Sequence, residues 1–216
     1  MTDLMDMLWQ GSVETLYMTL VATAFVLLGG VPLGVLLVAT DRGGIWEQPL
    51  LNKVLGSIVN IVRSAPFIIL MVALVAVTRF IVGTTIGTTA SIVPMVIAAI
   101  PFMGRVVEQS LREVDPGLVE AATAMGTSNW QMIVKLLIPE ALPSLIRGTS
   151  LMIISLIGLG AMAGAVGGGG LGAIAVTYGY MRFQTDVMLG CLVVLLLLVQ
   201  IIQFVGDRLA VACTHK

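Results

Sequence analysis

The strongest constraint on this chain is a series of long apolar runs that suit a lipid bilayer better than a small water-soluble core. One run, from Thr15 to Thr40, contains no charged residue. A membrane-spanning helix needs about 20 mostly apolar residues. Of the 216 residues, 58% are hydrophobic and 11% are charged, whereas soluble domains average about 45–50% and about 25%. The sequence therefore predicts an all-α integral membrane protein.

Five membrane spans are predicted from the positions of these runs: Thr15–Thr40, Ser57–Val82, Thr88–Gly104, Gly148–Val166 and Val187–Gly206. Pro32 is expected to kink the first span. The residues before it include Asp3, Asp6 and Glu14 but no Lys or Arg. A cleaved signal peptide has a basic amino-terminal region, so the first run is predicted to be a span. Residues 12–206 then form one transmembrane domain, and residues 207–216 form a tail.

The orientation of the spans follows from the distribution of basic residues. Five spans place the termini on opposite sides, and nine of the eleven Lys and Arg residues then fall on one side: Arg42, Lys53, Arg63, Arg105, Arg112, Lys135, Arg147, Arg208 and Lys216. Arg79 and Arg182 fall on the other side. Because Lys and Arg accumulate in cytoplasmic loops, the carboxyl terminus is predicted to be cytoplasmic and the amino terminus external.

The longest polar connection, residues 105–147, is predicted to lie in the cytoplasm and is called the coupling loop below. Asp115 followed by Pro116 is typical of a helix start. Gly126 provides a stop, and Ser128 with Gln131 forms the pattern of a capping box. The coupling loop is therefore expected to form two short helices outside the membrane. Pro139 and Pro143 should end or bend the second of these helices.

The coupling loop also carries a spaced motif, made of Glu120, Ala121, Ala122, Gly126, Leu136, Ile138 and Pro139. This motif resembles that of the permease family of ABC importers, except that Leu136 and Ile138 stand where the family usually has Ile and Leu. The resemblance implies that these residues dock into a groove on a separate ATPase subunit. Small Ala and Gly side chains permit close approach of another protein surface, and Glu120 supplies a charged contact. The alternative is an amphipathic surface helix without a partner.

Motifs that would make this chain an enzyme are missing. A P-loop needs Gly-Lys followed by Ser or Thr, and none of the three lysines follows a glycine. The only histidine is His215, so no metal cluster or acid–base site is predicted. Gly167 to Gly172 formally fits a dinucleotide motif, but it follows a span rather than a strand. A flexible outer turn with close backbone packing is predicted there, and no cofactor is expected on this chain.

Other segments of the chain resemble a more specific group within this family. Residues Ser57–Leu70, Thr78–Gly87 and Ala161–Gly172 are similar to the permease subunit of bacterial methionine importers, and the likeness extends over nearly the whole chain. It implies a homodimer of this subunit in the bacterial inner membrane. It also implies two ATPase subunits that bind ATP and Mg²⁺, and an external methionine-binding lipoprotein. Lipid surrounds the spans, and a net charge of −1 gives no reason to expect nucleic acid as a partner.

Three alternatives remain at this stage. The first is an importer permease for another small amino acid or polar solute. The second is a proton-coupled carrier, although such carriers place ionisable residues within their spans and no predicted span has an acidic residue near its centre. The third is a structural membrane scaffold, which would leave the coupling-loop motif unexplained.

Met162 is a candidate gate residue at the end of the fourth predicted span. It is a long, flexible side chain among small ones, from Gly158 to Ala165. Small residues let helices approach closely, and a flexible apolar side chain can close the gap that remains. Two copies of Met162 meeting at a dimer axis would form an apolar constriction. The alternative is that Met162 fills a packing void or faces lipid.

Overall fold

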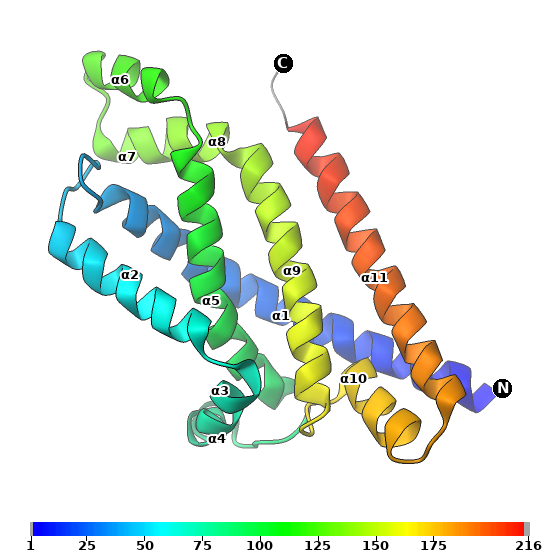
Figure 1. The fold of residues 1–216 in the computed structure, drawn as a ribbon. Coiled ribbons are helices and arrows are strands. Elements are labelled where there is room, and N and C mark those ends of the chain that lie inside the picture. The colour runs from blue at the N-terminus through cyan, green and yellow to red at the C-terminus, as the bar shows by residue number, and fades with distance from the viewer. Residues whose placement is uncertain (1, 214–216) are drawn as a thin grey trace. The chain divides into compact units, whose positions relative to one another are not determined.

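The computed structural model describes residues 2–213, and all regular secondary structure within that range is helical (Figure 1). His215 and Lys216 lie outside the described residues. The elements are α1 (Thr2–Ala39), α2 (Pro49–Ser64), α3 (Phe67–Ala73), α4 (Val75–Val82), α5 (Thr88–Arg112), α6 (Pro116–Ala124), α7 (Asn129–Gln131), the π-helix η1 (Met132–Leu137), α8 (Ile138–Glu140), α9 (Leu142–Gly164), α10 (Gly170–Ile174), the π-helix η2 (Ala175–Tyr180) and α11 (Thr185–Ala212).

Four helices among the described residues are long and apolar enough to cross a membrane by themselves: α1, α5, α9 and α11. The span predicted over Ser57–Val82 is instead broken into α2, α3 and α4, and α2 and α3 form one sharply bent pair. Pro66 explains the break, because proline lacks an N–H and disfavours helical geometry in the residue before it. The predicted count of five spans is reached when this bent pair is counted as one.

Several helices extend beyond the predicted span ends. α5 continues to Arg112 rather than ending at Gly104, and α9 begins at Leu142 rather than Gly148. α11 continues to Ala212, so much of the predicted tail is helical. The hydropathy of a sequence marks only the apolar part of a helix, whereas capping residues decide where the helix ends. α1 passes through Pro32 without interruption.

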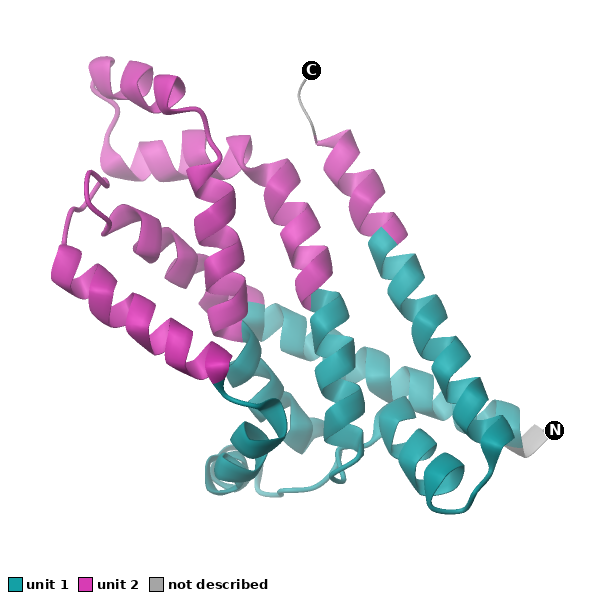
Figure 2. Ribbon diagram, viewed as in Figure 1, with its two compact units in different colours: residues 1–26, 65–99, 153–203 teal, residues 27–64, 100–152, 204–216 magenta. Residues whose placement is uncertain are grey.

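The chain divides into two compact units, coloured separately in Figure 2. Unit 1 comprises residues 1–26, 65–99 and 153–203, and unit 2 comprises residues 27–64, 100–152 and 204–216. α1, α5, α9 and α11 each contribute a part to both units. The coupling loop lies in unit 2, and the glycine-rich turn and Met162 lie in unit 1.

In unit 1 the glycine-rich turn packs against the helices around it, as the sequence predicts. A Cβ atom at Gly172 would collide with the backbone of Ala161. The N–H of Gly170 donates to the Glu14 carboxylate at 2.7 Å, and the N–H of Leu171 donates to the Thr15 hydroxyl at 3.0 Å. The backbone amides of the turn therefore donate to side chains of α1. This agrees with the prediction that the dinucleotide-like pattern is accidental.

In unit 2, α1 and α5 approach through glycines. A Cβ atom at Gly30 would lie 2.6 Å from the Cβ of Met103, and one at Gly34 would lie 2.6 Å from the carbonyl oxygen of Gly104 and closer still to the Cβ of Val107. Contacts of this length exclude any larger side chain unless the backbones separate. Glycine packing is a common way to bring membrane helices close together, and here it fixes the spacing of α1 and α5.

A Gly34→Ala substitution should therefore destabilise the protein by about 1–3 kcal/mol, the usual cost of overpacking. Gly158→Ala is the matched control, because its Cβ would meet nothing within 4 Å and alanine favours a helix over glycine by roughly 0.5–1 kcal/mol. The measurement is the melting temperature of each purified variant in the same detergent. Equal melting temperatures for the two variants would show that α1 and α5 are not in tight contact at Gly34.

Candidate functional site

The first half of the coupling loop forms α6 between the predicted start and stop signals. The Asp115 carboxylate accepts the N–H of Gly117 at 2.8 Å, and Pro116 occupies the first turn. At the other end Gly126 has φ of 77°, and the N–H of Thr127 donates to the carbonyl of Ala122 at 3.1 Å. This is the usual left-handed helix end, which favours glycine. The predicted cap and stop of this short helix are confirmed.

The second half of the coupling loop is a helical segment from Asn129 to Glu140 that includes the π-helix η1. Both bonds of the capping box between Ser128 and Gln131 are present, as predicted. Pro139 does not end the segment at its own position, because the helix continues through it to Glu140 and the π-helix η1 lies directly before α8. The segment ends at Ala141, one residue before α9 begins. Figure 1 shows α6 and α7 beyond the ends of α5 and α9.

The predicted docking residues divide into an outward and an inward set. Glu120, Ala121, Gly126 and Pro139 are exposed, Ala122 is buried, and Leu136 and Ile138 are half-buried. α6 packs against η1, whose Met132 and Ile133 are also buried. The motif therefore both joins the two halves of the coupling loop and presents an outer surface.

The two most exposed large apolar residues of the segment from α6 to α8 were not among the predicted docking residues. Met125 is 79% exposed and Trp130 is 68% exposed. Both lie in a polar stretch of sequence, where large apolar side chains that a helix leaves exposed often mark a protein contact. Their apolar character was visible in the sequence, but their exposure depended on the packing of α6 on η1.

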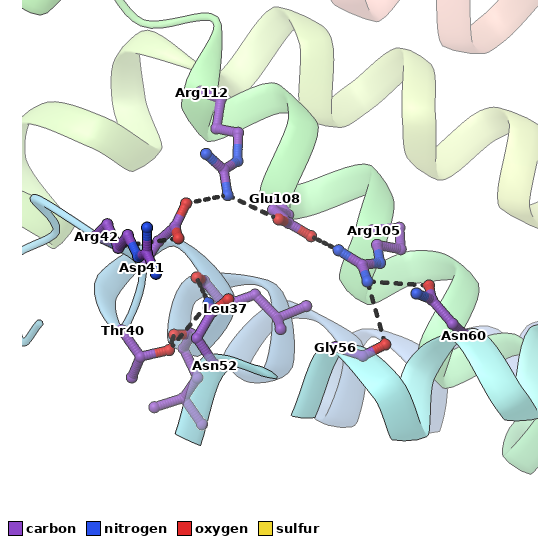
Figure 3. A network of polar contacts seen from close by, with 11 residues as sticks. Leu37, Thr40, Asp41, Arg42, Asn52, Gly56, Asn60, Arg105, Glu108 and Arg112 are labelled. Carbon is purple, nitrogen blue, oxygen red and sulfur yellow. Dashed lines mark hydrogen bonds and ion pairs between the residues drawn. The ribbon is translucent and has the colours of Figure 1, made fainter. Parts of the chain in front are cut away.

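A network of charged and amide side chains joins α5 to α2 and to the end of α1 (Figure 3). Arg112 donates to the carboxylates of Asp41 at 2.6 Å and Glu108 at 3.0 Å. Arg105 donates to Glu108 at 2.6 Å and to the side-chain oxygen of Asn60 at 3.0 Å. Glu108 is only 8% exposed, and its two arginine partners compensate for the loss of water around it.

The Asp41 carboxyl, which lies just beyond the end of α1, has a lowered pKa. The main cause is the hydrogen bond from Arg112, and the N–H of Arg42 contributes a second bond. Because the folded pKa is depressed, this group adds stability above its unfolded pKa and loses it as the pH falls through the folded value. At neutral pH the ion pair is therefore fully formed.

Sequence reasoning missed this network because it ended the third span at Gly104, which left Arg105, Glu108 and Arg112 in a loop. In a continuous helix, residues at these spacings share one face. A separate hydrogen bond joins the α1–α2 connection to the start of α7, because the side chain of Asn129 donates to the carbonyl of Ile45 at 3.3 Å.

Met162 is 51% exposed near the end of α9. Its neighbours are packed: Ala163 is fully buried, and the backbone of Ala161 lies against Gly172. Within a single copy of the chain Met162 therefore fills no packing void. About half of its side chain stays exposed beside these packed neighbours.

The helices and the polar coupling loop define an α-helical protein of the multi-pass membrane class. The chain belongs to the binding-protein-dependent transport system inner membrane components, whose family model matches residues 30–213. It is therefore a transport component of the inner membrane rather than an enzyme in itself.

Individual relatives cover nearly the whole chain. The probable D-methionine transport system permease protein MetI of Vibrio cholerae is 48% identical over 98% of this chain and 94% of its own length. The methionine import system permease protein MetP of Bacillus subtilis is 46% identical over 93% and 90%. A chain from a solved structure of the MetNI methionine ABC transporter in inward-facing conformations is 47% identical over 99% of both chains, with a TM-score of 0.97.

Proposed function

We propose that this chain is the permease subunit of an ATP-driven importer that carries methionine across the bacterial inner membrane. The observation that carries this proposal is the near-full-length likeness to proteins named as methionine permeases, at 46–48% identity. An importer for a different small solute would need a different binding protein and different pathway contacts. At this level of identity over at least nine tenths of each chain, we infer that both are shared with those relatives.

The proposed assembly contains two copies of this subunit, two ATPase subunits and an external methionine-binding lipoprotein. The ATPase, which would bind ATP and Mg²⁺, is inferred from the likeness to a chain of the MetNI methionine ABC transporter. The binding protein is inferred from the family description, which names binding-protein-dependent transport. The nine-to-two distribution of basic residues supports a cytoplasmic carboxyl terminus, and in that orientation the coupling loop would face the ATPase.

We propose that the coupling loop transmits ATPase motion to the helices. Its exposed surface, which includes Glu120, Ala121 and Gly126, provides the docking contact. The bond between Asn129 and the α1–α2 connection, together with the network around Glu108, provides a continuous set of contacts from that surface to α2 and α5.

Growth on limiting methionine tests the substrate. A methionine auxotroph without its own methionine importers should grow when it expresses this chain with its ATPase and binding protein, and it should stop when this chain alone is deleted. Uptake of radiolabelled methionine measures the effect directly. Uptake of another amino acid by the complete system, with none of methionine, would favour an importer for that solute.

A Gly126→Leu substitution tests the coupling loop. It should lower ATP-driven uptake at least tenfold while the subunit still inserts, because leucine disfavours the left-handed conformation by about 1–2 kcal/mol and adds bulk to the docking surface. Gly126→Asn is the matched control, since asparagine is similar in size but tolerates positive φ. Reduced uptake in both variants would identify side-chain bulk as the cause. Reduced uptake in the leucine variant alone would identify backbone geometry as the cause. Normal uptake by a normally expressed Gly126→Leu variant would contradict the coupling role.

We also propose that Met162 closes the pathway with its counterpart from the second copy. Met162→Ala should then make proteoliposomes leak small solutes and loosen the link between transport and ATP hydrolysis, without loss of assembly. Leu192→Ala on α11 is the control, because Leu192 is equally exposed at 51% but lies on a different helix. A tight Met162→Ala variant that also fails to cross-link through a cysteine at this position would leave Met162 as a lipid-facing residue.

A further inference from the structure

A cavity of about 660 Å³ lies in unit 2, between residues of α2, α5 and α9. Arg63, at the carboxyl end of α2, is one of its lining residues. Phe102 and Val106 of α5 and Leu151 of α9 contribute apolar surface. A cavity of this volume falls within the range for small-molecule sites, about 300–1,000 Å³.

Most of the charge around this cavity is already paired. Arg105, Glu108 and Arg112 also line it, but each belongs to the network described above. Glu113 lies at the end of α5 and accepts a single hydrogen bond, from the Ser144 hydroxyl at 2.9 Å. The exposed Arg63 side chain makes no hydrogen bond or ion pair with any residue in the range 2–213.

An arginine without a partner on a cavity wall in a membrane protein needs an explanation. Ionisable residues in such proteins face cavities or pathways, because a charge in hydrocarbon is costly. A guanidinium binds carboxylates through paired, charge-assisted hydrogen bonds. Phe102, Val106 and Leu151 line the same cavity, so the cavity combines one unpaired cation with apolar surface.

Glu113 restricts the kind of ligand further. A carboxylate without a cationic partner in the same cavity repels a ligand that carries only negative charge and attracts an ammonium group.

We propose that this cavity is a transient binding site for a zwitterionic amino acid on the permease itself, in which Arg63 holds the α-carboxylate and Phe102, Val106 and Leu151 contact an apolar side chain. The proposal rests on the proposed function and deepens it, since it gives the subunit its own contact with substrate. Methionine has the required groups, with a carboxylate, an ammonium group and an unbranched thioether.

The test uses the complex of this chain with its ATPase in phosphatidylcholine nanodiscs, without nucleotide and without binding protein. Saturation-transfer NMR measures binding of L-methionine and of L-methioninol, in which an alcohol replaces the carboxylate. Wild-type protein should bind methionine in the millimolar range and methioninol at least tenfold more weakly. Arg63→Ala should lose the preference for methionine, and Arg63→Lys should keep part of it, because the charge remains.

Lys53→Ala is the matched control, because Lys53 is an exposed cation on the same helix but does not line the cavity. It should bind methionine like the wild type. ATP hydrolysis by each complex reports whether a variant has folded and assembled. The comparison of the two ligands on wild-type protein needs no variant, so a misfolded Arg63→Ala would not prevent the test.

Three results would overturn the proposal: no methionine binding to the wild-type complex, equal binding of methionine and methioninol, or unchanged methionine preference in a folded Arg63→Ala. A fourth arm repeats the measurement with phosphatidylglycerol in the nanodisc. Loss of methionine binding there would assign Arg63 to an anionic lipid headgroup instead. The proposed function fails separately, if the complete wild-type system does not take up methionine.

Discussion

The close contact between α1 and α5 in unit 2 is the interaction on which the polar architecture of that unit depends. Gly30, Gly34 and Gly104 have no side chains to hold the two helices apart. Because the backbones nearly touch, Asp41 at the end of α1 reaches Arg112 at the end of α5 at 2.6 Å. A separation even slightly larger would replace this ion pair by two separately hydrated charges, whose interaction would be far weaker.

From that contact, a connected set of bonds extends in two directions. Arg112 and Arg105 share the buried carboxylate of Glu108, and Arg105 continues to Asn60 on α2. On the other side, the α1–α2 connection accepts a bond from Asn129 of the coupling loop. A carboxylate that accepts from two guanidiniums has little freedom to move independently of either. The network thus ties α2 to α5, and the bond from Asn129 ties the α1–α2 connection to the start of α7.

In unit 1 the glycine-rich turn forms its polar contacts through backbone amides rather than through paired charges. Its glycine-rich turn has three glycines with positive φ, at positions 167, 169 and 170, and directs backbone amides toward Glu14 and Thr15 of α1. In a protein surrounded by hydrocarbon, irregular backbone persists only where the protein itself supplies the hydrogen bonds. Glu14 of α1 therefore has a structural role, because it accepts a hydrogen bond from the glycine-rich turn.

The sequence by itself determined the all-helical membrane class, the positions of the long apolar helices and the ends of α6, because hydrophobic length and capping chemistry are local properties. Asp115, Gly126 and the Ser128–Gln131 box acted as their residue types predict. Only the tertiary structure decided the break of the second span at Pro66, the burial of Glu108 between two arginines, and the cavity in which Arg63 has no partner among residues 2–213. These features depend on residues that lie far apart in the chain, and their spacing is set by how closely the helix backbones can approach.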